Sequence, residues 1–319
     1  MSEYKKFNLK DLPKLLKQSF WQWNKHDPWR MSAIVAYYAL LSLPALMVIV
    51  VNTVGAIWGK DIVEGRLTSQ ISSALGPDAA EYIQKIITQT QTGGNSFIAS
   101  SIGIGILIFG ATGVFFHLKI SMNEIWEIKL IKGLSFKRML LDRLISLGFI
   151  LVLGFLLLIS FLLTAILSFF SAFIKTILPD FVVYVAYVFD FILSFGVISM
   201  LFALIFMYLP DAKIKWKTVT MGAVLTAFLF FIAKYLLGYY FSIAEPGSTY
   251  GAAGSVILVL LWVYYSCLIF FFGANFTRVF SIRYGEGIIP NENYSRVRKK
   301  DVLIDQVGIS TDIDSSNLE

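Results

Sequence analysis

The feature that most constrains this chain is a series of long apolar stretches that carry almost no charge. A membrane hydrocarbon core about 30 Å thick is crossed by about 20 apolar residues in α-helical conformation. Two of the stretches contain one charged residue each, Asp190 and Lys234, and the others contain none. The stretches cover residues 33–58, 96–116, 144–174, 181–209, 219–243 and 250–276. The sequence therefore predicts an all-α, polytopic membrane protein with six transmembrane helices.

The composition agrees with a chain whose main solvent is lipid. Of the 319 residues, 57% are hydrophobic and 15% are charged, whereas about a quarter of the residues are charged in an ordinary soluble domain. The first apolar stretch follows the polar and basic residues 1–32, and it is too long for a cleaved signal peptide. We therefore expect it to be a retained membrane anchor.

Lysine and arginine residues are distributed unevenly between the flanks of the apolar stretches. They are abundant in residues 1–32, 117–143, 210–218 and 277–300. The flanks on the other side carry only Lys60, Arg66, Lys85 and Lys175. Because cytoplasmic flanks carry the excess of positive residues, this distribution predicts that both termini lie in the cytoplasm.

The segments outside the apolar stretches suggest a division into domains. Residues 33–284 form the predicted six-helix transmembrane domain, with a short helical outer segment at 65–91 that is broken at Gly76-Pro77. Residues 285–319 are polar, then acidic and serine-rich, which predicts a disordered cytoplasmic tail.

Residues 1–32 are predicted to form a basic, amphipathic cytoplasmic segment. Apolar side chains recur at helical spacing among its lysines: Leu9, Leu12, Leu15, Leu16, Phe20 and Trp23. Such a helix either lies on the anionic inner leaflet or packs on the helix bundle.

The two charged residues inside apolar stretches are candidates for a functional pair. A charge at the centre of a membrane-spanning helix costs roughly 2.5–3.5 kcal/mol on insertion scales. Asp190 and Lys234 are predicted at similar depths in consecutive spans, so they could form an ion pair or share a polar cavity. The alternatives are that the pair only locks two helices together, or that the Lys234 amine reaches the interface along its stem.

A second polar group lies at the inner end of the second span, where His117, Asn123 and Glu124 precede Trp126. Asn123 and Glu124 are adjacent, so they point about 100° apart on a helix and do not share a face. We expect these residues to cap the helix, to bind the membrane interface or to contact a partner, and not to bind a metal.

The segment before the last span predicts non-helical backbone at the membrane boundary. Glu245 and Pro246 open a short run that ends at Tyr250, and such backbone is tolerated where it faces protein or a water-filled cavity. Gly251 and Gly254 then allow close helix packing. In the first span, Pro44 predicts a kink.

The sequence offers no pattern for catalysis or for a cofactor. The single cysteine, Cys267, lies in an apolar stretch, and the two histidines, His26 and His117, lie in different segments without ligand spacing around them. Phosphate-binding glycine loops and hydrolase motifs are absent from the sequence. We therefore expect a protein that is not an enzyme and that needs no metal or cofactor.

Three groups of motifs give the chain a resemblance to a known family. They are Ala36-Tyr37-Tyr38-Ala39-Leu40-Leu41-Ser42-Leu43-Pro44; Gly110-Ala111-Thr112-Gly113-Val114 followed by Met122-Asn123-Glu124-Ile125-Trp126; and Tyr250-Gly251-Ala252-Ala253-Gly254-Ser255 followed by Leu261-Trp262-Val263-Tyr264 and Gly273-Ala274.

With these motifs in this order, the chain resembles the YihY/BrkB family of bacterial inner-membrane proteins. The resemblance implies a six-helix, multi-pass protein of the inner membrane, and it implies no established biochemical activity. Members often carry the label ribonuclease BN, which the scarcity of metal-ligating residues in this sequence argues against.

Two functions from different classes remain. The first is transport or lipid handling, with Asp190, Lys234, Pro44 and residues 245–250 shaping a polar path or a lateral groove. The second is a membrane scaffold that binds envelope proteins or a second copy of the chain. Membrane lipids are expected partners in both cases and nucleic acid in neither, because the basic residues flank apolar stretches. Transport or lipid handling is favoured, because helix packing alone does not require two ionisable residues at matching depth in the membrane.

Overall fold

The computed structural model describes residues 7–42, 113–130, 179–244, 254–291 and 294–296, with isolated positions between 59 and 88. The labelled elements are η1 (Leu9–Asp11), α1 (Leu12–Lys25), β1 (Ile128–Leu130), α7 (Pro179–Tyr208), β2 (Ala212–Lys213), α8 (Trp216–Ala244), α10 (Gly254–Tyr284), β3 (Ile289–Pro290) and β4 (Tyr294–Arg296). Residues 28–42 and 113–125 are also helical.

Three of the described helices are long and apolar enough to cross a membrane. The qualifying segments are Phe191–Tyr208, Trp216–Phe241 and Val256–Tyr284, which correspond to the last three predicted spans. Apolar residues surround these helices on all sides, as expected where lipid and not water faces them. The predicted span 144–174 lies outside the described residues, and only 33–42 and 113–116 of the first two are described. The number of six spans therefore remains a prediction.

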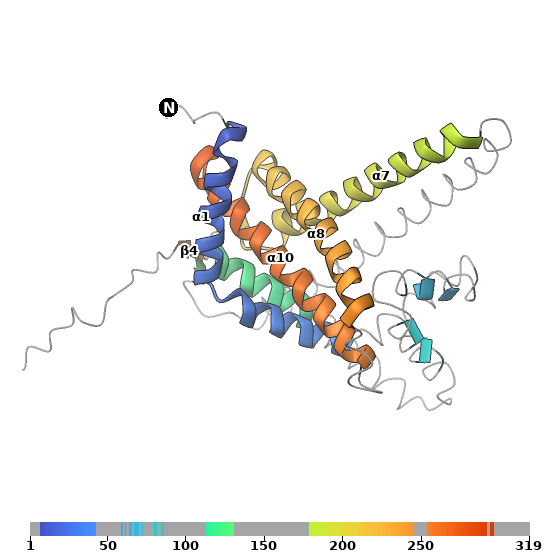
Figure 1. Ribbon diagram of the computed structural model, residues 1–319. Helices are drawn as coiled ribbons and strands as arrows, with labels where there is room; N and C mark the ends of the chain where they lie inside the picture. The colour runs from blue at the N-terminus through green and yellow to red at the C-terminus, as the bar shows by residue number, and fades with distance from the viewer. Residues whose placement is uncertain are drawn as a thin grey trace, which may run out of the picture.

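Helix α8 packs between α7 and α10. The short connection 209–215 makes α7 and α8 an antiparallel pair, and the rings of Phe191 and Phe231 lie 5.5 Å apart between them. Figure 1 shows that α7 leans away from the other helices toward its N-terminal end. Apolar side chains there, such as Ile192, are exposed. Lipid contact would cover such side chains in a membrane.

Helices α8 and α10 approach each other closely through a reciprocal pair of glycine–threonine contacts. Gly222 on α8 faces Thr277 on α10, and Gly273 on α10 faces Thr226 on α8. Each threonine hydroxyl donates a hydrogen bond to the carbonyl of the glycine four residues earlier in its own helix, at 2.6 Å for Thr226 and 2.8 Å for Thr277. The hydroxyls are thereby satisfied inside an apolar interface, as buried polar groups must be.

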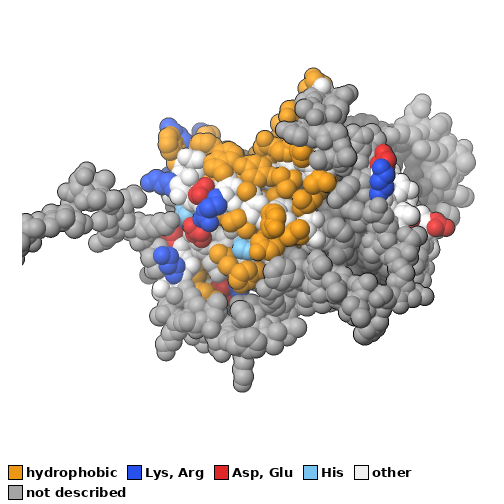
Figure 2. All heavy atoms as spheres, turned by 90° about the horizontal axis from the view of Figure 1, so that it is seen from below, with side chains coloured by type: hydrophobic (Ala, Val, Ile, Leu, Met, Phe, Trp, Pro, Cys, Tyr) orange, Lys and Arg blue, Asp and Glu red, His pale blue; other side chains and the backbone are white. Residues whose placement is uncertain are grey.

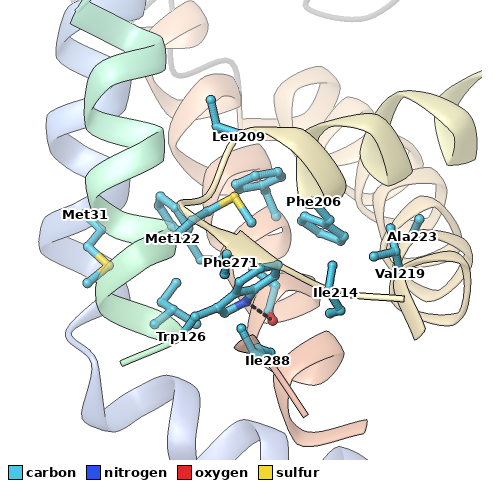
Figure 3. Packing of buried hydrophobic residues seen from close by; sticks show 14 of the residues in the cluster. Met31, Met122, Trp126, Phe206, Leu209, Ile214, Val219, Ala223, Phe271 and Ile288 are labelled. Atoms are coloured by element: carbon cyan, nitrogen blue, oxygen red, sulfur yellow. Dashed lines mark hydrogen bonds between the residues drawn. The ribbon is translucent and has the colours of Figure 1, made fainter. Parts of the chain in front are cut away.

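The largest buried cluster lies where residues 113–125, the end of α7, the start of α8 and α10 meet (Figure 3). Trp126, Phe206 and Phe271 are fully buried in it. The indole Nε1 of Trp126 donates a hydrogen bond to the Ala274 carbonyl oxygen at 3.0 Å. A buried tryptophan requires such a partner, so this bond fixes the 113–125 segment against α10.

Helix α1 packs along α10, which is one of the two predicted positions of the amphipathic segment. Leu15, Ser19 and Trp23 are buried on the packed face of α1. Asn275 Nδ2 donates to the Ser19 carbonyl oxygen at 2.6 Å. The helix therefore packs on the bundle, while Phe20 stays exposed on its outer side.

Two short antiparallel ribbons close this end of the molecule. Strand β1 pairs with β4, with Ile128 opposite Arg296, and β2 pairs with β3, with Ala212 opposite Pro290. Strands β3 and β4 lie within residues 285–319, the segment predicted to be a disordered tail. The all-α prediction likewise holds only as mostly helical, since these strands are too short to leave a periodic pattern in the sequence.

Charged side chains of the described residues gather at the same end of the molecule. On the face shown in Figure 2, most of the coloured lysine, arginine and acidic residues lie at one end, and hydrophobic side chains cover the middle. This separation is the one expected for a protein whose middle lies in lipid and whose end lies in water.

Candidate functional site

A buried polar cluster joins the second predicted span to the loop between α7 and α8. Asn123 Nδ2 donates to Asp211 Oδ2 at 2.9 Å, and Asn123 Oδ1 accepts the Asp211 backbone N–H at 2.9 Å. Lys119, one helical turn before Asn123, forms an ion pair with Asp211 Oδ1 at 3.0 Å. The Lys119 and Asp211 side chains are only 13% and 11% exposed. Spacing of four residues places Lys119 and Asn123 on one face of the helix, which is why both reach one carboxylate.

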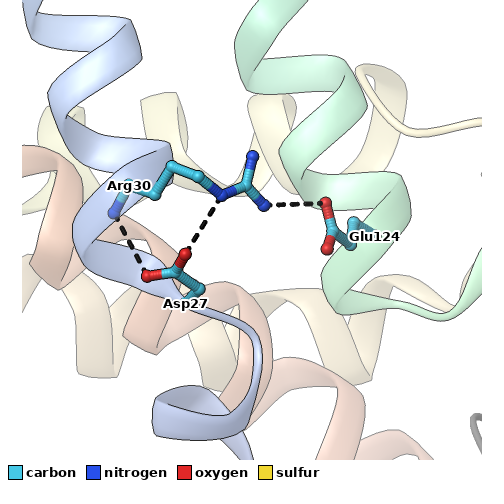
Figure 4. A network of polar contacts seen from close by, with 3 residues as sticks. All are labelled: Asp27, Arg30 and Glu124. Atoms are coloured by element: carbon cyan, nitrogen blue, oxygen red, sulfur yellow. Dashed lines mark hydrogen bonds and ion pairs between the residues drawn. The ribbon is translucent and has the colours of Figure 1, made fainter.

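Glu124 belongs to a different and more exposed group (Figure 4). Its Oε2 lies 3.7 Å from Arg30 Nη2, and Arg30 Nε lies 3.0 Å from Asp27 Oδ2. Asp27 has a φ of 51° at the junction between α1 and the helix at 28–42. Aspartate tolerates this left-handed conformation better than most residues do. Exposed pairs of this kind contribute little to stability, on the order of 0–1 kcal/mol.

A second buried ion pair links α10 to the turn after Trp126. Arg278 Nη2 lies 2.6 Å from Glu127 Oε2, with the two side chains 7% and 18% exposed. Arg278 Nη1 also donates to Gln22 Oε1 of α1 at 3.1 Å. One guanidinium therefore connects three segments that are far apart in the sequence.

These clusters hold together segments that are far apart in the sequence. Each buried charge, on Lys119, Asp211, Glu127 or Arg278, has an oppositely charged partner within 3.0 Å. Within the described residues, no group of three or more histidine, cysteine or acidic side chains could hold a metal ion.

An apolar groove of about 290 Å³ lies on the surface between α1, α8 and α10. Its walls include Phe20 and Trp23 from α1, Ile232 and Ala233 from α8, and Ile269 and Phe272 from α10. The lining is almost entirely apolar, and the groove is open to the outside. The α8 and α10 walls belong to segments that are long and apolar enough to cross a membrane.

The predicted charged pair is only half described. Lys234 is exposed on α8, and Asp190 lies within α7, but its side chain is not among those described. Helices α7 and α8, which carry the two residues, are neighbours, since the rings of Phe191 and Phe231 lie 5.5 Å apart. Whether the two charges interact remains a prediction.

The other predicted site residues divide into described and undescribed positions. The His117 ring stacks on Tyr38 with centroids 4.5 Å apart, which joins the 113–125 helix to the helix at 28–42. Gly254 is buried at the start of α10. The remaining predictions lie outside the described residues: Pro44, Glu245, Pro246, Tyr250 and Gly251.

Sequence reasoning did not find Asp211, Lys119, Glu127 or Arg278 as members of buried ion pairs. In the sequence, Lys119 and Arg278 indicate only the orientation of the chain in the membrane. A usable signal existed in α10, where Asn275 and Arg278 lie one turn apart at the end of a long apolar stretch. No comparable signal marks Asp211, whose partner Asn123 lies 88 residues away.

Comparison with known proteins agrees with a membrane location. The family described as "Virulence factor BrkB" matches residues 19–295. A "UPF0761 membrane protein" from Teredinibacter turnerae is 26% identical over 82% of the chain, which spans only 59% of that relative's length. Proteins of the same name from Alteromonas mediterranea and Pseudoalteromonas translucida are 26% and 23% identical, covering 76% and 77% of the chain and 79% of each relative. No solved structure matches the chain.

Proposed function

This chain belongs to the BrkB virulence factor family, and we propose that it is a multi-pass protein of the bacterial inner membrane. Its curated relatives are named membrane proteins. In this proposal the protein has six transmembrane helices and both termini in the cytoplasm. The described spans support the last three helices. The lysine and arginine distribution supports the orientation.

Within that membrane, the protein handles lipid: it binds the hydrocarbon chain of a membrane lipid in the groove between α1, α8 and α10. The observation that carries this proposal is the composition of the groove wall, which is apolar on all three helices, two of them long and apolar enough to cross a membrane. A polar solute would form no hydrogen bonds with such a surface. A lipid acyl chain can replace its contacts with neighbouring acyl chains by equivalent van der Waals contacts with the groove wall.

The protein acts without catalysing a reaction. This part of the proposal is supported by the buried charged groups of the polar clusters, which are engaged with one another and hold helices together. A catalytic acid or base needs access to a substrate proton. In Asp211, Oδ1 instead pairs with the Lys119 ammonium and Oδ2 accepts a hydrogen bond from Asn123.

The test is labelling by a phospholipid that carries a photoactivatable group on its acyl chain. The full chain is placed in lipid nanodiscs, irradiated, digested and analysed for labelled peptides. We expect label on the α8 and α10 segments around Ala233 and Phe272. Ala233→Phe fills the groove and is expected to remove that label.

Val224→Phe supplies the matched control, because Val224 is an exposed residue of the same helix and does not line the groove. It should leave labelling around Ala233 unchanged. Equal labelling of the wild-type chain and Ala233→Phe, with both variants folded, would contradict lipid binding in the groove.

The scaffold function is the second candidate, and one observation favours it. Arg278, Trp126 and Asp211 tie α1, α10 and the ribbons into a firmly packed end that offers a fixed surface for a partner protein. A scaffold would keep its partners when the groove is filled. Co-purification of the same envelope proteins with the wild-type chain and Ala233→Phe, without any groove labelling, would favour it over lipid handling.

A further inference from the structure

The groove has a defined direction relative to the membrane. Helix α1 runs antiparallel to α10. Asp11, before the start of α1, accepts a hydrogen bond from Tyr284 Oη at the end of α10, at 2.7 Å. Near the end of α1, the ring centroid of Trp23 lies 6.1 Å from that of Phe272, which belongs to the apolar segment of α10. The α1 end of the groove lies toward the water-facing end, and the Ala233 side lies deeper.

Positive side chains lie on α1 between the groove wall and the water-facing end of the helix. Lys17 is exposed three residues before Phe20, about 4.5 Å along the helix and within about 60° of the same direction. Lys14 is exposed one turn further from the apolar segment. A lipid whose chain enters the groove would therefore place its headgroup beside these ammonium groups.

Trp23 supplies an independent polar feature at the groove wall. The side chain is 93% buried, since only 7% of it is exposed, and it lines the groove. Among the described residues its indole Nε1 has no hydrogen-bond partner. A buried donor without a partner costs about 1–3 kcal/mol, so a ligand acceptor at this level would be stabilised. The ester carbonyls of a phospholipid lie between its headgroup and its acyl chains, at the level where Trp23 stands relative to Lys17 and Ala233.

The geometry points to an anionic diacyl phospholipid as the ligand of this groove. One acyl chain lies along Ala233 and Phe272, and Lys14 and Lys17 contact the phosphate-containing headgroup. This inference rests on the proposed lipid-handling function and adds the class of lipid to it.

The experiment compares photoactivatable phosphatidylglycerol with phosphatidylcholine in otherwise identical nanodiscs that contain the full chain. The wild-type protein is expected to be labelled preferentially by phosphatidylglycerol. Lys14→Gln with Lys17→Gln should reduce that preference about 25-fold, since each of the two lysines near an anionic surface contributes about one factor of five. Labelling around Ala233 by phosphatidylcholine should persist, because the apolar wall is unchanged.

Lys213→Gln with Lys217→Gln is the matched control. Both lysines are exposed near the start of α8, and Lys217 lies twelve residues before Leu229, about 18 Å along the helix. An equal loss of preference in the control pair would show a general effect of surface charge and would overturn the headgroup assignment. An unchanged preference in the Lys14/Lys17 variant would overturn it too.

Ala233→Phe separates the two levels of the proposal: if it leaves labelling intact, lipid handling itself fails, whereas if it blocks labelling while the lysine variants keep their preference, only the choice of lipid fails.

Discussion

A side-chain carbon added to Gly222 of α8 would lie 1.8 Å from the Thr277 hydroxyl oxygen of α10. That distance is far shorter than a van der Waals contact, and both partners lie on helices that contribute walls to the groove. Between membrane-spanning helices, association depends on close packing of small residues, because lipid and apolar side chains are equivalent solvents. The position of α8 beside α10, and with it the shape of the groove, therefore depends on the absence of a side chain at Gly222.

We expect Gly222→Ala to lower the free energy of unfolding by about 1–3 kcal/mol, the usual range for overpacking. The melting temperature of the purified protein in detergent measures this. Gly238→Ala is the matched control on the same helix, because nothing lies within 4 Å of a carbon added there. Combining Gly222→Ala with Thr277→Ala should cost less than the sum of the two single variants, since the hydroxyl is gone. Additive costs would contradict the proposed contact.

Asn123→Ala should destabilise the protein because it leaves the Asp211 N–H and one carboxylate oxygen without their described partner. The expected loss is about 1–3 kcal/mol for a buried unsatisfied group. Glu124→Gln, the adjacent residue, is the control: its contact with Arg30 is exposed, so a change of about 1 kcal/mol or less is expected. Similar melting temperatures for the two variants would contradict a structural role for the Asn123–Asp211 contact.

The difference between Asn123 and Glu124 also illustrates what the sequence could predict. The helices α7, α8 and α10 follow from local hydropathy, which needs no knowledge of distant residues. The divergence of two adjacent side chains follows from helical geometry alone. The identity of their partners does not, because Asp211 is 88 residues from Asn123 and its loop has no characteristic motif. The sequence does not predict the groove either, because its walls come from three helices whose relative positions cannot be derived from the sequence.

The docking of α1 marks a similar limit. The spacing of its apolar residues predicted one apolar face, and lipid and protein are equally good covers for such a face. The contact that decides the matter, between Ser19 and Asn275, joins residues 256 positions apart.

Glu127 is expected to show two opposing effects when it is replaced. It has a φ of 57°, a left-handed conformation that is costly for residues with a side chain, and its carboxylate pairs with the buried Arg278. Glu127→Ala should destabilise by about 3–5 kcal/mol, as for the loss of one partner of a buried pair. Glu127→Gly loses the same partner but relieves the backbone, so it should be about 1 kcal/mol more stable than Glu127→Ala. Denaturation midpoints in the reverse order would contradict this account.

Breaking the Lys119–Asp211 pair from one side should cost more than replacing both charges. Lys119→Met leaves the Asp211 carboxylate 11% exposed without its ammonium partner, and an unpaired buried charge costs about 3–5 kcal/mol. Adding Asp211→Asn removes the charge and keeps an amide oxygen for Asn123, so the double variant should recover part of the loss. Thermal unfolding of the four proteins in the cycle gives the coupling. A double variant less stable than Lys119→Met would contradict this pairing.

The last strands supply a prediction about where the folded part of the chain ends. Ile288 is buried in the main core cluster, and the Asn291 N–H donates to the Asp211 carbonyl oxygen at 3.0 Å, beside the Lys119–Asn123 cluster. A chain ending at Gly287 loses this side chain and both β3 and β4, so we expect a melting temperature well below that of the full chain. A chain ending at Lys300 keeps both ribbons and should unfold close to the full-length value. Because both truncations remove the acidic residues after 300, a difference between them isolates the strands, and equal stability would show that the ribbons do not stabilise this end of the bundle.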